Sequence, residues 1–123
     1  MEVHMRVVNR DQVEKMTVSN PLFTGPEVSI QLLLPDSKEF VVNVVHFGKG
    51  VRNKFHAHSD EQILIVTSGR GIVATESMQL EVVEGDMILI HANEKHWHGA
   101  TSDSEFSHIY ISKPDSQLTQ LEE

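Results

Sequence analysis

The sequence contains no cysteine, so neither disulfide bonds nor thiolate chemistry can contribute to its fold or function. Positive charge is also scarce, because 10 Lys and Arg residues stand against 18 Asp and Glu residues, for a net charge of −8. An acidic chain without a basic run argues against a nucleic-acid-binding surface and against docking on anionic lipid. No apolar stretch approaches the roughly 20 residues that cross a bilayer, and the first residues lack a signal peptide's apolar run. We therefore expect a cytoplasmic protein without nucleic-acid or membrane partners.

What the sequence does contain is a series of short apolar segments separated by Gly and Pro, within a length of 123 residues that suits one domain. This pattern is typical of an all-β sandwich or barrel. The segments at 28–34 and 40–47 should form a hairpin, because only a short connection separates them. The expected strands span residues 2–7, 28–34, 40–47, 63–67, 72–75, 80–83, 87–90 and 106–111.

Three further expectations concern the edges of this pattern. The glycines at 69 and 71 should end the strand at 63–67. One helical turn is expected within 9–16. We expect a barrel domain over residues 1–114, followed by a polar tail at 115–123 whose state, disordered or helical, the sequence leaves open.

Two histidines separated by one residue, His56 and His58, dominate the middle of the chain. In a strand such residues point to the same face, with Cα atoms about 6.6 Å apart, so both rings can reach one metal ion. The polar residues 59–61 should turn the chain, so that Gln62 opens the returning strand and comes back toward the histidines. Two alternatives are a pair of histidines on a solvated face, and Glu61 as the ligand in place of Gln62.

The spacing of these residues resembles the two motifs of the cupin superfamily. The first motif is matched by Gly50, His56, His58 and Gly69, with Gln62 where a Glu is usual. The second is matched by Gly85 and His96, while His91, Asn93 and Ala100 replace the usual Pro, Gly and Asn, so an altered loop is expected there. The resemblance implies a single-domain jelly-roll barrel, the cupin-type double-stranded β-helix. It also implies one divalent metal ion with these ligands: His56, His58, Gln62 and His96.

The amide at position 62 has an electrostatic consequence. Three neutral imidazoles and a neutral amide leave the full +2 charge on the ion, which makes it a stronger Lewis acid than a site with a Glu. Imidazole-rich ligation suits Mn, Fe, Co, Ni or Zn and argues against Ca or Mg.

A narrower resemblance is to small bacterial cupins that include the manganese-dependent hydroxynitrile lyases and the carboxymuconolactone-decarboxylase-associated cupins. It is carried by residues 23–25, 56–58 with Gln62, 64–67, 94–100 and His108. It implies manganese as the first choice of metal and His108 as the catalytic base. Pocket-lining positions matched by this resemblance are Asn43, Val45 and Asn53, and Asn43 is more polar than the small residue common there.

Strand alternation adds three candidates for the pocket wall. Tyr110 and Ser112 share a face with His108. His98 follows His96 by two residues, so we expect it at the pocket mouth, behind the ligands, or else on the surface.

Three functions are compatible with these residues. The first is a metal-dependent lyase that acts on a small cyanohydrin or a related hydroxy or carbonyl compound. The second is an Fe- or Mn-dependent dioxygenase or oxidase, and the third is a non-catalytic module that binds a small ligand. The segments at 63–66 and 87–90 are apolar on both faces, which a single small barrel does not cover, so a homodimer is expected.

Overall fold

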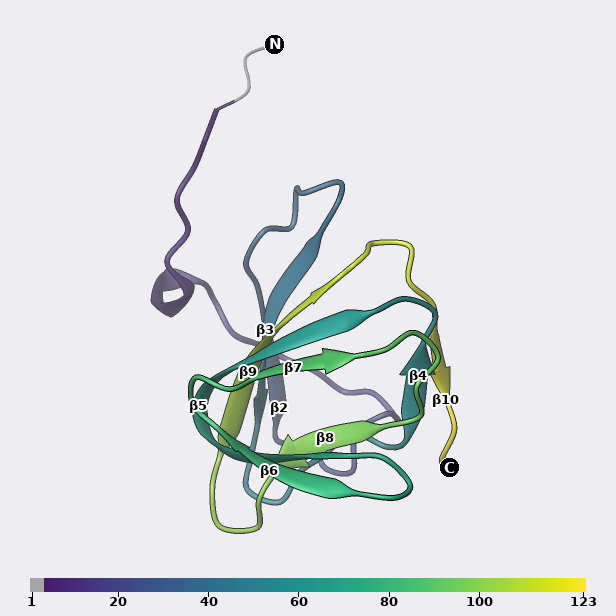
Figure 1. The fold of residues 1–123 in the computed structure, drawn as a ribbon. Coiled ribbons are helices and arrows are strands. Elements are labelled where there is room, and N and C mark those ends of the chain that lie inside the picture. The colour runs from purple at the N-terminus through teal and green to yellow at the C-terminus, as the bar shows by residue number, and fades with distance from the viewer. Residues whose placement is uncertain (1–3) are drawn as a thin grey trace.

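The computed structural model describes residues 4–123, which form an antiparallel β-barrel (Figure 1). The described part has one short 3₁₀ turn, Arg10–Gln12, and no α-helix, and none of its helical segments could span a membrane. The predicted all-β class is therefore confirmed, and so is the single helical turn. The strands are β1 (Met16–Thr17), β2 (Val28–Leu32), β3 (Val41–Phe47), β4 (His56–His58), β5 (Gln62–Ala74), β6 (Gln79–Val83), β7 (Met87–Ile90), β8 (Trp97–Ala100), β9 (Phe106–Ser112) and β10 (Leu118–Gln120).

The main sheet is organised around β5, the longest strand. The order is β1-β2-β3-β9-β5-β6, and β7 and β8 also pair with β5, while β4 and β10 form a separate pair. The first half of β5 lies between β9 and β7, and its second half lies between β6 and β8. The predicted hairpin is confirmed, because β2 and β3 pair antiparallel from Val28 opposite Phe47 to Leu32 opposite Asn43.

The prediction that the glycines end the first part of β5 is wrong, because the strand continues through them. A register shift between Val66 and Ser68 turns β5 from one part of the sheet to the other. Gly69 lies in the left-handed region with φ of 74°, and a Cβ there would fall 1.8 Å from the Glu105 carbonyl oxygen. A Cβ on Gly71 would fall 2.5 Å from the Phe106 ring. These glycines allow close approach of β9 rather than a strand end.

Both ends of the chain also differ from the expectations. Residues 4–7 are not a strand, and the rest of the strand predicted at 2–7 lies outside the described residues. The sequence left open whether the tail is disordered or helical. It is neither at Leu118–Gln120, because these residues form β10, which pairs with β4. The C-terminus therefore lies beside the histidine strand (Figure 1).

The hydrophobic core is built from residues of β2, β3, β5, β6, β8 and β9. Phe47 and Phe106 stack with ring centroids 6.0 Å apart at its centre. Its buried members are Val28, Val45, Phe47, Val51, Val66, Val82, Ala100 and Phe106. Part of the barrel interior is open, and the core residues Val28, Val45 and Phe47 line it together with several histidines.

Candidate metal centre and cavity

The histidine strand is fixed from two sides. His56 and His96 form a reciprocal bridge, with His56 N–H donating to the His96 carbonyl at 2.9 Å and His96 N–H donating to the His56 carbonyl at 3.0 Å. On the other side β10 pairs with β4, placing Leu118 opposite His58 and Gln120 opposite His56. The turn at 59–61 then leads into β5, which begins at Gln62 as predicted.

Three imidazoles gather at this point. Nitrogen atoms of His56, His58 and His96 lie within 4.8 Å of one another, close enough for one ion to bind all three. The ring centroids are 4.3 Å apart for His56 and His96, 5.0 Å for His56 and His58, and 5.6 Å for His58 and His96. The solvated-face alternative is therefore wrong for this pair of histidines.

Backbone hydrogen bonds orient two of the rings. His56 Nδ1 lies 2.6 Å from the Lys54 carbonyl oxygen, and His96 Nδ1 lies 2.7 Å from the Glu94 carbonyl oxygen. Each Nδ1 must donate to its carbonyl, so each Nε2 keeps a free lone pair. This arrangement is typical of metal-binding histidines, whose second nitrogen donates to a fixed acceptor.

Three buried polar atoms in this region have no hydrogen-bond partner: His58 Nε2, His96 Nε2 and Gln62 Oε1. Leaving such atoms unpaired is costly, and a divalent cation bound by the cluster would satisfy the two imidazole nitrogens. The three imidazole nitrogens of the cluster suit a transition metal better than Ca or Mg. Glu61 is not a competing ligand, because its side chain is 64% exposed and lies near His91.

Burial keeps these histidines neutral. It lowers the pKa of His56 to about 3, with a further contribution from His96, and it lowers the pKa of His58 to about 4. Neutral imidazole is the form that binds metal, so the site needs no deprotonation near neutral pH.

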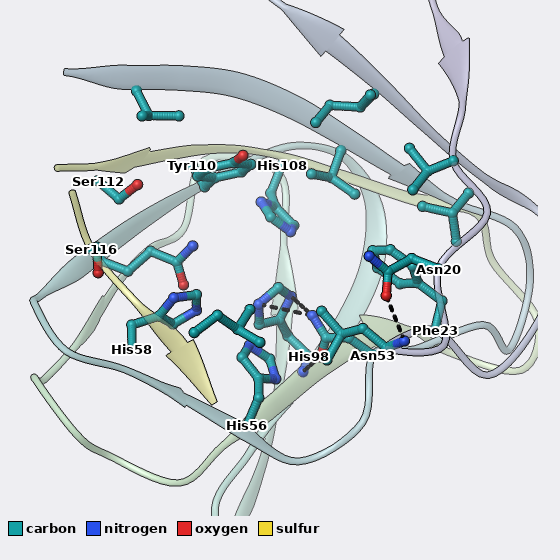
Figure 2. Close-up of a pocket in the computed structure, with 18 of the residues that line it drawn as sticks. Asn20, Phe23, Asn53, His56, His58, His98, His108, Tyr110, Ser112 and Ser116 are labelled. Atoms are coloured by element: carbon teal, nitrogen blue, oxygen red, sulfur yellow. Dashed lines mark hydrogen bonds between the residues drawn. The ribbon is translucent and has the colours of Figure 1, made fainter. Parts of the chain in front are cut away.

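The cluster opens into a cavity of about 380 Å³ (Figure 2). Of the residues predicted to line a pocket, Val45, Asn53, His98, Tyr110 and Ser112 line this cavity, together with the ligand candidates His56, His58 and Gln62. Asn43 is not among the lining residues, and its side-chain nitrogen donates to Tyr110 Oη at 2.8 Å. The remaining lining is mostly apolar and includes Leu22, Phe23, Val28, Ile30 and Phe47.

His108 lies on the wall opposite His56 and His58 (Figure 2). It is fully buried and packs against Phe47 and Phe106, with ring centroids at 5.8 and 5.6 Å. Burial lowers the pKa of His108 to about 4, so the ring is neutral at pH 7. Its Nδ1 lies 3.3 Å from the Ile109 carbonyl, and its Nε2 is buried without a partner. A neutral ring with a free nitrogen can accept a proton.

His98 lies between the two walls, and its burial makes the surface alternative wrong. Its ring centroid is 5.9 Å from His56, 5.8 Å from His96 and 4.8 Å from His108. Asn53 holds it in place, because His98 N–H donates to Asn53 Oδ1 at 2.8 Å and Asn53 N–H donates to the His98 carbonyl at 3.0 Å. Burial, with His108 nearby, keeps the pKa of His98 well below its usual range.

The loop before His96 keeps one feature that the motif's usual Gly would supply. Asn93 has φ of 64°, in the left-handed region that Gly and Asn tolerate best. Its N–H donates to the His58 carbonyl at 2.7 Å, so this turn also supports the ligand strand.

Sequence reasoning missed the contribution of the C-terminal segment. Its cavity-lining residues are Lys113, Pro114, Ser116 and Leu118. The segment reads as polar and carries no motif, and only the pairing of β10 with β4 reveals its position.

Comparisons with known proteins agree with this geometry. The family model of the cupin domain matches residues 43–112. The (R)-mandelonitrile lyase of Granulicella tundricola is 38% identical over 68 residues, which cover 54% of this chain and 52% of that protein. The chain therefore spans about half the length of this curated relative.

Among solved structures, a cupin-like protein from Thermotoga maritima is 34% identical with a TM-score of 0.82, covering 91% of this chain and 89% of that one. The polyketide cyclase RemF from Streptomyces resistomycificus has a TM-score of 0.80 over 98% of this chain and 89% of its own. At 21% identity it supports the fold alone.

Proposed function

This chain belongs to the cupin family. We propose that it is a divalent-metal-dependent lyase that acts on small cyanohydrins or related hydroxy and carbonyl compounds. The observation that carries the proposal is the cluster of His56, His58 and His96. It lies beside a cavity that Gln62 and His108 also line, each with a buried polar atom that has no hydrogen-bond partner. The partial identity with a mandelonitrile lyase supports the choice of substrate class.

In this proposal His56, His58, His96 and Gln62 hold the ion. A divalent metal bound there supplies Lewis acidity to an oxygen atom of the substrate. We expect manganese from the resemblance, with iron, zinc, nickel or cobalt as alternatives that the same donor set accepts.

His108 carries the proton in this proposal. Its neutral Nε2 accepts the proton of the cyanohydrin hydroxyl while the bond between carbon and the nitrile carbon breaks. The carbonyl forms, the electron pair leaves with cyanide, and the His108 imidazolium returns the proton to give hydrogen cyanide. The ring needs no other partner for this step, because its Nε2 is otherwise unpaired.

In this proposal the apolar lining of the cavity contacts the rest of the substrate. The side chains of Leu22, Phe23 and Val28 present hydrocarbon to the cavity. They also exclude water, which strengthens the electrostatic interactions of the histidines with the reacting atoms.

The test is elemental analysis of protein purified without chelator, alongside His56→Ala and the control His91→Ala. We expect about one transition-metal ion per chain, lost in His56→Ala and kept in His91→Ala, whose side chain is 69% exposed. Wild-type protein loaded with manganese should then release cyanide from mandelonitrile. Oxygen uptake by the iron-loaded protein without cyanide release would instead favour an oxidase, and protein that refuses every metal would overturn both functions.

We also propose that the chain forms a homodimer through the outer face of the main sheet. Two cross-strand rows run over β3, β9, β5 and β7, one of Val42, Ile111, Ile63 and Leu89, the other of Val44, Ile109, Ile65 and Met87. Met87 is 68% exposed, Leu89 50% and Ile63 36%, so the rows leave apolar surface uncovered at their β5 and β7 end, whereas Val44 at the β3 end is buried. Light scattering should give twice the 13.9-kDa chain mass, and Leu89→Lys should shift the protein to monomer.

A further inference from the structure

The C-terminal segment lies beyond the family match, which ends at residue 112, yet it closes one side of the cavity. Lys113, Pro114, Ser116 and Leu118 all contribute to the cavity wall. Figure 2 shows Ser116 at the same end of the cavity as His58 and Ser112, while Phe23 and Asn20 lie at the other end. The segment is therefore placed to contact whatever the cavity holds.

Hydrogen bonds fix the position of this segment. Ser59 N–H donates to the Gln117 carbonyl at 2.9 Å, and Gln117 N–H donates to Ser59 Oγ at 2.8 Å. β10 then pairs with β4, and Leu121 N–H donates to the Phe55 carbonyl at 2.8 Å. Because these bonds lie on both sides of Leu118, the backbone next to Ser116 is held against the ligand strand.

Ser116 stands out within this segment because its Oγ is buried and has no hydrogen-bond partner. A buried hydroxyl loses free energy when it is unpaired, so such an atom indicates a partner that binds there. The neighbouring hydroxyl of Tyr110 already accepts a hydrogen bond from Asn43 Nδ2. Among the hydroxyls that line the cavity, that of Ser116 is the buried one without any hydrogen-bond partner.

We propose that Ser116 is a substrate-binding residue, whose hydroxyl donates a hydrogen bond to an acceptor atom of the substrate distinct from the oxygen that the metal polarises. This inference rests on the proposed function and narrows its substrate class. The ligand has an apolar body, which occupies the end of the cavity near Phe23, and a second acceptor such as a nitrile nitrogen or a carbonyl oxygen.

The test compares two unreactive ligands in metal-loaded protein by ligand-observed NMR titration. Phenylacetonitrile carries a nitrile but no hydroxyl, so it cannot be cleaved in the proposed reaction, and ethylbenzene lacks any acceptor. Ser116→Ala should weaken the binding of phenylacetonitrile about five- to tenfold, the loss of one hydrogen bond, and leave the binding of ethylbenzene unchanged. Thr119→Ala, which removes an exposed hydroxyl from the same segment, should change neither.

Binding of phenylacetonitrile to Ser116→Ala within twofold of wild type would overturn the proposal, as would a wild-type protein that binds no nitrile. Cyanide release from mandelonitrile is measured in parallel on the wild type. Nitrile binding that depends on Ser116 without any cyanide release would overturn the lyase reaction and leave the role of Ser116 standing.

Discussion

Buried histidines lie on both sides of the cavity, but different contacts hold their rings in place. On the β4 side, the Nδ1 atoms of His56 and His96 lie 2.6 and 2.7 Å from backbone carbonyl oxygens. On the β9 side, His108 Nδ1 has only a 3.3 Å contact to the Ile109 carbonyl, and its ring packs against phenylalanines. All of these rings are buried and neutral.

The difference lies in what holds each ring. A short bond to a carbonyl fixes the tautomer and the direction of Nε2, which is what a metal ligand requires. A ring held by apolar packing keeps an unpaired nitrogen that can accept a proton, although burial lowers the pKa of His108 and so disfavours its charged form. We propose that the neighbours of each histidine decide whether it serves in ligation or in proton transfer.

The largest expected effect comes from removing the proton acceptor while leaving the metal cluster intact. His108→Gln should lower the rate of cyanide release from mandelonitrile by about 10²- to 10⁴-fold, the usual contribution of a general base. Metal content should stay at the wild-type level, because His108 is not part of the ligand cluster.

The matched control for this variant is His98→Gln, since His98 is equally buried but has Asn53 as a polar neighbour. The rate of cyanide release should fall less in His98→Gln than in His108→Gln. Circular dichroism should confirm that both variants fold. Equal rates for His108→Gln and wild type would show that His108 is not the base.

A smaller effect concerns the pH dependence of stability in the metal-free protein. Burial lowers the pKa of His108 from 6.5 to about 4, so between these pH values the unfolded chain takes up a proton that the folded chain does not. The contribution of the neutral His108 ring to the free energy of unfolding is fully present above pH 6.5. It is lost as the pH falls to about 4, and the loss is on the order of 3 kcal/mol for this residue.

The measurement is urea unfolding of chelator-treated protein at pH 7 and at pH 4.5, for wild type and His108→Gln. The other buried histidines contribute to both proteins, so the difference between the two pH dependences reports His108. A variant that loses as much stability as wild type over this range would contradict the buried, neutral state of the ring.

The sequence predicted that His56 and His58 lie side by side because that geometry is local, whereas His96, the third member of the cluster, was supplied by the family resemblance. Alternation in a strand places His56 and His58 on one face, and a short turn returns Gln62 to them. The continuity of β5 through Gly69 was not predictable, because it depends on how closely the distant Glu105 backbone approaches. The position of Ser116 was not predictable either, because it also depends on a contact between distant segments. Its place in the cavity wall comes from the pairing of β10 with β4, about sixty residues apart in the sequence.

The smallest expected effect tests how the C-terminal segment supports the β4 wall. The Glu122 carboxylate accepts hydrogen bonds from Phe55 N–H at 2.8 Å and from Arg52 Nη2 at 2.9 Å. The bond from Phe55, followed by that from Arg52, lowers the pKa of Glu122, so the carboxylate stays charged. The Arg52 guanidinium lies 4.5 Å from the Trp97 ring centre, which connects Glu122 to the segments that carry His56 and His96.

Glu122→Ala should therefore loosen the ligand strand without removing a ligand, and metal should transfer to a chromogenic chelator about tenfold faster than from wild type. Glu123→Ala removes a neighbouring exposed carboxylate and should leave the transfer rate unchanged. If both variants lose metal at the wild-type rate, the bridge from His56 to His96 and the pairing of β10 with β4 hold the β4 wall without Glu122. The two walls would then differ only in the hydrogen bonds of their own rings.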